Sequence, residues 1–362
     1  MEGFARCFGD VPDPRADNAC HQLVEVLFIA LAAVLCGARG CSDMAEFGRA
    51  KEPLLRQMLR LAHGVPSHDT FSRVFRRLDP VAFEAAFGKF MAGFAERLRG
   101  VVAIDGKALR GAFEHGRRST PLHLVNVWAV EARLAVAQRL APGRNEVAGA
   151  LEVLQLLSLD GCILTADALH CHPKMAGLIR ERGAQYVLAL KGNHAPLLAA
   201  ATARLAAAKA RRQAEQTLAT GHGRTERRHA TVVTAAALGR RHGFPDLAAV
   251  ARVETRRTVD GKPEPPLVRH FVLSRPFAPN KLLDIVRAHW TIENQLHWVL
   301  DVVFDEDRAR NRKDNGPENL ATLRKIALNL LRNDPAKGSL PSKIKRAGWN
   351  DAFLLNLLSQ MR

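Results

Sequence analysis

The segment VVAIDGKALRG, residues 101–111, decides the fold, because four apolar residues lead directly into Asp105 and a glycine. A short apolar run of this kind is typical of a buried strand, and a carboxylate at its end is costly unless it has a partner. The run CILTADALHC, residues 162–171, has the same form around Asp167. Because proteins hold hard cations such as Mg²⁺ with carboxylates from separate elements, both acids are candidate metal ligands.

The residues that follow this segment alternate between predicted strands and helices. Strands are expected at 101–105, 122–132, 132–142, 161–169 and 184–192, the first three as a meander. Helices are expected at 145–157, at 173–182 between Pro173 and Gly183, and from about 193 to 212. The order β-β-β-α-β-α-β-α predicts a mixed α/β fold, and it is the element order of the RNase H-like fold.

Residues 1–95 have helical patterns throughout and form a predicted helical domain. In the stretch GVPSHDTFSRVFRRLDP, Phe71, Val74, Phe75 and Leu78 recur at helical spacing and share one buried face. The other side carries Arg73, Arg76 and Arg77. A short Gly-Pro turn before such a helix resembles the second helix of a helix-turn-helix, so these arginines are either DNA contacts or ordinary solvated side chains.

Residues 215–280 do not fit the predicted core and indicate an inserted β-rich segment. A long amphipathic helix is predicted at 281–304, and it carries Glu293. The insertion explains why Glu293 follows Asp167 at such a distance in sequence. As a third metal ligand, Glu293 has rivals nearby: Asp301, Asp305, Glu306 and Asp307.

Composition narrows the function further. The 362 residues include 53 Lys+Arg against 36 Asp+Glu, a formal charge of +17, which favours a polyanionic partner such as nucleic acid. The longest apolar stretch, near residues 23–36, contains Glu25 and is too short to cross a bilayer, and the N-terminus is not a secretory signal. We therefore expect a cytoplasmic, nucleoid-associated protein without a membrane partner.

Several strings together resemble the DDE-type insertion-sequence transposases, in particular the H-repeat-associated group. They are VPDPR (11–15), GVPSHDTFSRVF (64–75), AIDGKALRG (103–111), LTADALHC (164–171), YVLALKGNH (186–194), HWTIENQLHWVLDVVFDED (289–307) and NGPENLATLRKIALNLL (315–331). The resemblance covers nearly the whole chain in order. It implies a transposase-associated helical domain at 1–95 and an RNase H-like catalytic domain at 96–362.

The resemblance also implies the site and its partners. The acidic triad carries over to Asp105, Asp167 and Glu293, with Mg²⁺ as cofactor and Mn²⁺ as a substitute. The Tyr-Arg-Glu-Lys pattern that related transposases keep around the glutamate is absent, since His289 stands four before it and Leu300 seven after it. The implied partner is double-stranded DNA, both the terminal inverted repeats of the element and the target, bound by a homo-oligomer.

Other polar residues are candidate DNA contacts. Lys107 and Lys191 follow strand ends and are either phosphate contacts or solvated lysines. His297 lies one turn after Glu293, where it orients the glutamate, touches DNA or is a structural histidine. A basic run after the helix supplies Arg308 and Arg310. Three functions stay open: a transposase, a metal-dependent nuclease of the same fold, and an inactive DNA-binding protein derived from a transposase.

Overall fold

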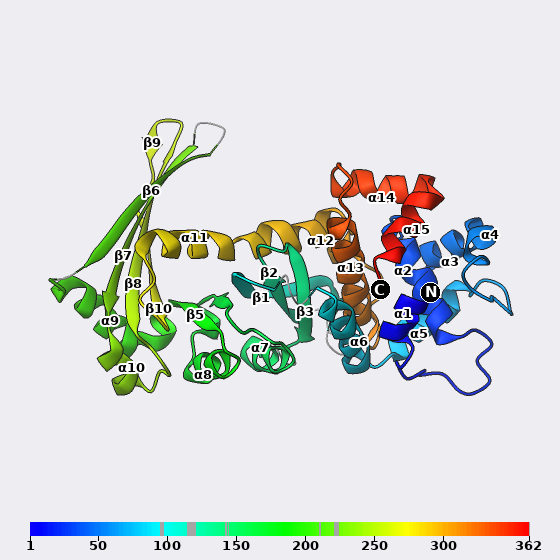
Figure 1. Ribbon diagram of the computed structural model, residues 1–362, viewed down its shortest axis with the longest axis horizontal. Coiled ribbons are helices and arrows are strands. Elements are labelled where there is room, and N and C mark those ends of the chain that lie inside the picture. The colour runs from blue at the N-terminus through cyan, green and yellow to red at the C-terminus, as the bar shows by residue number, and fades with distance from the viewer. Residues whose placement is uncertain are drawn as a thin grey trace.

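The computed structural model describes residues 1–94, 98–113, 121–141, 143, 145–209, 211–220 and 224–361. The molecule is elongated, with a bundle of helices at one end, a sheet in the middle and a group of long strands at the other end (Figure 1). Among the described residues, no helix combines the length and the apolarity that a transmembrane span needs. The mixed α/β fold predicted from the sequence is confirmed.

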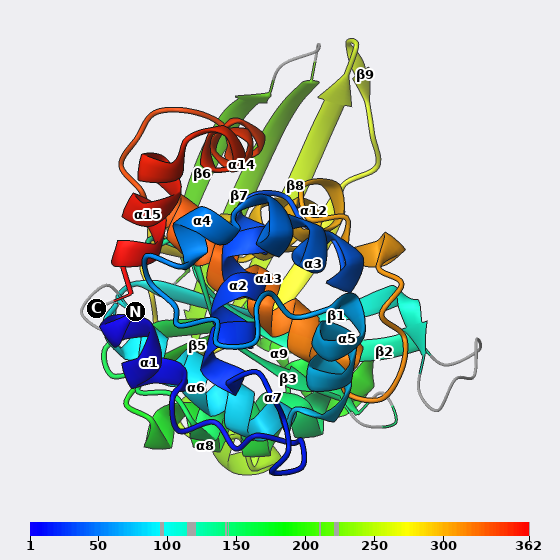
Figure 2. The ribbon, with the colours of Figure 1, turned by 90° about the vertical axis from the view of Figure 1, so that its right-hand side faces the viewer.

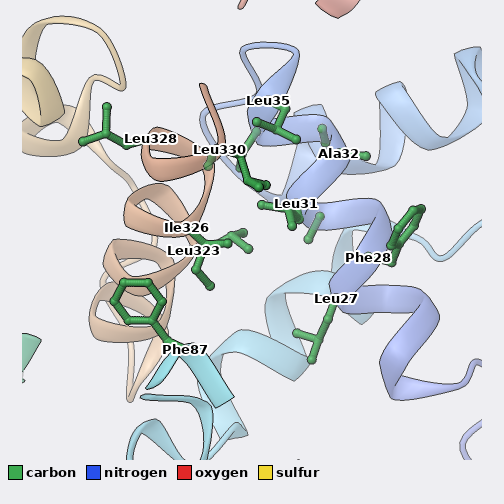
Figure 3. Close-up of a cluster of buried hydrophobic side chains, with 14 of the residues drawn as sticks. Leu27, Phe28, Leu31, Ala32, Leu35, Phe87, Leu323, Ile326, Leu328 and Leu330 are labelled. Carbon is green, nitrogen blue, oxygen red and sulfur yellow. The ribbon is translucent and has the colours of Figure 1, made fainter. Parts of the chain in front are cut away.

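The helical end combines the first and the last helices of the chain. Its N-terminal helices are α1 (Glu2–Phe8), α2 (Leu23–Leu35), α3 (Cys41–Ala50), α4 (Glu52–Leu55), α5 (His68–Arg77) and α6 (Pro80–Ala92). Its C-terminal helices are α13 (Gly316–Asn333), α14 (Leu340–Trp349) and α15 (Asp351–Ser359). Figures 2 and 3 show α2 lying against α13, with Leu31 and Leu35 of one helix near Ile326 and Leu330 of the other.

The apolar composition of α2 follows from its position in the core. Apolar residues surround the helix on nearly every side, and almost all of them are buried, as expected for a helix in the middle of a core. Its one charge, Glu25, is buried as well, and its carboxylate accepts hydrogen bonds from the backbone N–H groups of Arg60 (2.8 Å) and Leu61 (3.1 Å).

The division into domains 1–95 and 96–362 stays a prediction, because its boundary lies within residues 95–97, outside the described residues.

The central sheet has the strand order and directions of the RNase H-like fold. Its strands are β1 (Val101–Phe113), β2 (Pro121–Ala129), β3 (Leu134–Leu140), β4 (Ile163–Ala166) and β5 (Gln185–Leu190). They lie in the order β3-β2-β1-β4-β5, with β2 antiparallel to both neighbours and β4 parallel to β1 and β5. Helices α7 (Glu146–Gln155) and α8 (Pro173–Glu181) are the crossovers that parallel pairing requires.

The segment predicted as a β-rich insertion is β-rich, and it also continues the central sheet. Helix α9 (Ala195–Ala207) precedes this segment, and the strands and helix that follow are β6 (Arg212–Thr220), β7 (Arg224–Thr234), α10 (Ala236–His242), β8 (Ala249–Val259), β9 (Lys262–Pro263) and β10 (Leu267–Leu273). Strand β10 pairs antiparallel with β5, and the order runs on as β10-β8-β7-β6. The described residues thus form one ten-stranded sheet, whose far strands project from the body (Figure 1).

The helix predicted at 281–304 is present but interrupted. Helix α11 (Pro279–His289) is followed by a π-helical turn, η6 (Ile292–His297), and then by α12 (Trp298–Val302). An apolar pattern continues through all three pieces, so the sequence gives no sign of the wider turn. Such π turns frequently occur at functional sites.

Side chains cover the free edge of β3. Asn329 of α13 accepts a hydrogen bond from the Ala135 N–H (3.0 Å) and donates one to the Ala135 carbonyl (2.7 Å). Glu84 of α6 accepts the Gln138 N–H (3.1 Å), and the Gln138 side chain bonds Thr322 (2.7 Å) and Lys325 (2.6 Å). A sheet edge would otherwise expose unpaired backbone groups, so these contacts both close the edge and attach the helices to the sheet.

Asn329→Ala should destabilise the protein by about 2–4 kcal/mol, because it leaves the Ala135 N–H and carbonyl buried without partners. Chemical denaturation measures the change. Asn18→Ala, in an exposed loop, is the matched control and should stay within about 0.5 kcal/mol of wild type. An Asn329→Ala protein as stable as the control would show that β3 does not depend on this contact.

Candidate functional site

Two of the predicted acids reach one end of the sheet through strand pairing. Strands β1 and β4 are parallel, and Ile104 of β1 pairs with Ala166 of β4. Asp105 and Asp167 each follow their paired residue by one position, so they lie at the same level, Asp105 within β1 and Asp167 just after the end of β4. Together with Glu293, both line a cavity of about 510 Å³. The structure therefore brings all three predicted acids to one place.

The acidic cluster also contains His297. The imidazole Nδ1 lies 3.4 Å from Glu293 Oε2 and 3.8 Å from Asp105 Oδ2. Burial, together with the nearby carboxylates of Glu293 and Asp167, raises the pKa of Asp105. The imidazole of His297 holds the pKa of Glu293 below its usual range.

Contacts from the sheet and from α13 fix the π turn that carries Glu293. The Trp128 indole N–H of β2 donates to Thr291 Oγ1 (3.1 Å) at the start of the turn. Arg332 of α13 donates to the Gln295 carbonyl and lies over the Trp128 ring at 4.6 Å. The position of Glu293 therefore depends on packing against β2 and α13 as well as on its own helix.

Asp167 also stabilises the local structure. Its Oδ1 accepts a hydrogen bond from the Leu169 N–H (3.0 Å) and caps the 3₁₀ turn η4 (Ala168–His170). The nearby His289, four residues before Glu293, is half-buried, and its Nδ1 lies 3.2 Å from Thr165 Oγ1. Burial lowers the pKa of His289 to about 4, so this imidazole is neutral near pH 7 and offers no positive charge to a phosphate.

The four rivals of Glu293 are engaged with cations. Lys107 Nζ lies 2.7 Å from Asp301, 3.2 Å from Glu306 and 3.5 Å from Asp307. The fourth rival, Asp305, pairs with Arg39 (3.0 Å) and Arg308 (3.7 Å). The geometry thus joins Glu293, rather than these residues, to Asp105 and Asp167.

Lys107 is placed differently from a solvated lysine. Its side chain is only 6% exposed. Burial acts to lower the pKa of Lys107, but the carboxylates of Glu306, Asp301 and Asp307 outweigh it, and the pKa is raised. A phosphate contact would require this ammonium to leave three carboxylates.

The other predicted basic residues lie in three places. Lys191 is exposed and lines the acidic cavity at the end of β5. Arg73 and Arg77 are exposed on α5, while Arg76 Nε pairs with Asp314 at 2.7 Å. Arg308 and Arg310 line a second cavity, of about 530 Å³, together with Arg39, His68 and Ser72.

Sequence reasoning missed two residues beside the cluster. Asn126 of β2 is fully buried, and its Nδ2 lies 3.2 Å from His297 Nε2. The available signal was an amide in an otherwise apolar strand, since such a group needs a buried partner. Arg269 of β10 lines the acidic cavity and lies 4.8 Å over the Trp290 ring. Nothing local in the sequence connects this insertion residue with the site.

The donor set fits a divalent cation. One ligand atom each from Asp105, Glu293 and His297 lies within 4.8 Å of the others. The ion pairs within the described part of the chain give Asp105, Asp167 and Glu293 no lysine or arginine partner. Clustered carboxylates without a cationic side chain repel one another, and a bound cation relieves that repulsion.

Comparisons with known proteins agree over most of the chain. A family model described as "DDE_Tnp_1-associated" matches residues 5–91, and one described as "Transposase DDE domain" matches residues 96–330. "Putative transposase YncI" of Escherichia coli O157:H7 is 31% identical over 360 residues, 96% of this chain and 92% of that protein. "H repeat-associated putative transposase YhhI" of Escherichia coli (strain K12) is 30% identical over 361 residues, 96% of each chain. A cryo-EM structure of a piggyBac transposase synaptic complex with hairpin DNA aligns with 98% of this chain and 77% of that chain, at 12% identity and a TM-score of 0.44.

Asp105→Asn should separate stability from metal binding. In a chelator the variant should be more stable than wild type by about 1–3 kcal/mol, because one member of a repelling cluster is gone. Saturating Mg²⁺ or Mn²⁺ should stabilise wild type by about 2–3 kcal/mol and leave the variant unchanged. Thermal unfolding with and without metal measures both effects, and a wild type indifferent to both ions would contradict the metal assignment.

Lys107→Met should destabilise the protein by about 3–5 kcal/mol, because it leaves buried carboxylates without their cation. Denaturant unfolding measures this loss, and the exposed Lys174→Met is the control. The opposite pattern, normal stability with weakened DNA binding, would favour the phosphate contact that the sequence predicted for Lys107.

Proposed function

The chain belongs to the family of transposases with a DDE domain, and from that membership we propose that it cuts and joins DNA at the terminal inverted repeats of an insertion sequence. Membership confirms the resemblance seen in the sequence. One observation supports the catalytic proposal above all others. Three carboxylates from β1, from the end of β4 and from the π turn line one cavity, and the ion pairs of the described residues leave them without a lysine or arginine.

In this proposal, Asp105, Asp167 and Glu293 hold divalent cations, Mg²⁺ or in its place Mn²⁺. Such ions lower the pKa of the attacking hydroxyl group and stabilise charge on the phosphate and on the leaving oxygen. The chain supplies the fixed ligands. Asp105 is part of a paired strand, one oxygen of Asp167 is tied to the Leu169 N–H, and Glu293 lies on the π turn that β2 and α13 fix in place.

Cleavage and strand transfer then use the same residues with two nucleophiles. Water attacks the phosphodiester in cleavage, and the DNA 3′-hydroxyl that cleavage produces attacks the target phosphodiester in strand transfer. A nuclease of the same fold would accept water alone. The two functions therefore differ in whether the site admits a DNA end, and the products of the reaction distinguish them.

The proposed partner is double-stranded DNA, bound in the cytoplasm by a homo-oligomer. Its support is the charge of +17 and the exposed basic residues. Lys191 is suited to a phosphate near the reacting one because it lines the acidic cavity. Arg73, Arg76 and Arg77 on α5, with Arg308 and Arg310, are suited to backbone contacts farther away. We leave Lys107 and His297 out of the DNA surface because both are buried.

Glu293→Gln should abolish cleavage of DNA that carries the flanking inverted repeats, while wild type cleaves it in Mg²⁺ or Mn²⁺. A lost metal ligand removes several kcal/mol of transition-state stabilisation, on the order of a 100-fold loss or more. Gel assays of nicked and joined products measure the effect, with mobility shifts to check DNA binding. Asp284→Asn, on the exposed side of α11, is the matched control and should cleave normally.

Each alternative has its own outcome in this assay. Cleaved ends without joined products would favour the nuclease. DNA binding without cleavage by wild type would favour the inactive binding protein. Equal cleavage by wild type and Glu293→Gln would remove Glu293 from the site.

A further inference from the structure

His297 lies beside Asp105 and Glu293, and the proposal above gives it no chemical function. Its side chain is 6% exposed. The imidazole presents one nitrogen, Nδ1, to Asp105 and Glu293, and the other, Nε2, to Asn126. A buried histidine between two carboxylates and an amide is either a hydrogen-bond donor to the acids or a further ligand of the same cation.

The distances favour a shared cation. A hydrogen bond between nitrogen and oxygen spans about 2.7–3.2 Å. The Nδ1 atom lies 3.4 Å from Glu293 Oε2 and 3.8 Å from Asp105 Oδ2, and both distances are longer than that range. Neighbouring ligand atoms of an octahedral ion with bonds of ~2.1 Å are about 3 Å apart, and those of larger ions are farther apart. All three ligand atoms lie within 4.8 Å of one another, a spacing that small movements of the side chains would close around one ion.

Asn126 supplies the second observation. Its side chain is fully buried on β2, and its Oδ1 has no hydrogen-bond partner among the described residues, although a buried acceptor without a partner is costly. The oxygen and nitrogen of an amide are nearly the same in shape, so a half-turn of the amide directs Oδ1 at Nε2. With the proton on Nε2 donated to Asn126, the Nδ1 lone pair points at the carboxylates.

We propose that His297 is a metal ligand through Nδ1 and that Asn126 orients it by accepting the Nε2 proton. The proposal rests on the proposed function, since it concerns the same metal site. Metal-binding histidines commonly donate their second ring N–H to a carbonyl or carboxylate, which fixes the tautomer. Asn126 takes that place, and β2 and α13 hold the turn that presents the histidine.

An imidazole ligand changes which ion the site prefers. Carboxylate and water ligands suit Mg²⁺, whereas imidazole suits transition metals. A site with Asp105, Glu293 and His297 therefore favours Mn²⁺ over Mg²⁺ more than a site of carboxylates alone does. This preference separates a ligand from a residue that only positions Glu293, because a positioning residue would affect both ions alike.

The test is pulsed electron paramagnetic resonance of the full-length protein with Mn²⁺ bound. A directly bound imidazole gives a nitrogen hyperfine coupling, which ¹⁵N-histidine labelling changes without any substitution in the chain. We expect the coupling in wild type, its loss in His297→Gln, and Mn²⁺ binding weakened about 10- to 100-fold in that variant. His297→Asp should reduce the preference for Mn²⁺ over Mg²⁺ by about tenfold, measured by competition.

The outcomes separate this inference from the proposed function. If wild type binds neither ion, the metal site of the proposed function fails. If Mn²⁺ binds without a nitrogen coupling, only the ligand role of His297 is overturned, and His297 is a positioning residue. A coupling that persists in His297→Gln would assign the nitrogen to another histidine, such as His289, and would equally overturn the proposal. If the variants fail to fold, labelled wild type still overturns the proposal when it binds Mn²⁺ and shows no nitrogen coupling.

Discussion

Side chains, and not another strand, cover the edge of strand β3. The candidate functional site depends on this contact. Two hydrogen bonds between the Asn329 side chain and the Ala135 backbone hold α13 against the sheet. One turn further along, Arg332 of the same helix holds the Trp128 ring and the Gln295 carbonyl. The π turn and Glu293 are thereby tied to a helix that also forms the core of the helical end. Helix α13 therefore supports both the hydrophobic core of the helical end and the position of Glu293.

Two oppositely charged residues of β1, Asp105 and Lys107, have very different surroundings. Asp105 and Lys107 lie on the same face of the strand, because side chains alternate. Lys107 forms ion pairs with Asp301, Glu306 and Asp307, so carboxylates of the protein itself balance its positive charge. Asp105 has other carboxylates as neighbours instead. The separate network around Lys107 keeps this lysine away from the carboxylates of Asp105 and Glu293.

Local pattern predicted the order of strands and the two aspartates, because a buried strand that ends in an acid is visible within ten residues. Glu293 came from family resemblance, since its helix offers several acids. Interactions over long separations escaped prediction. No local signal shows that Lys107 meets residues 301–307, that β10 pairs with β5, or that Asn126 faces His297. The π turn was missed because apolar spacing continues through it.

The burial of α2 under α13 also imposes an order in time. Residues 23–35 leave the ribosome long before residues 316–331 are made, yet the later segment covers the earlier one. During most of synthesis α2 is covered by its N-terminal neighbours but not by α13, so the part translated first is completed last. A gene copy broken before α13 would therefore yield a product in which one apolar side of α2 is exposed, the kind of surface that chaperones and proteases recognise.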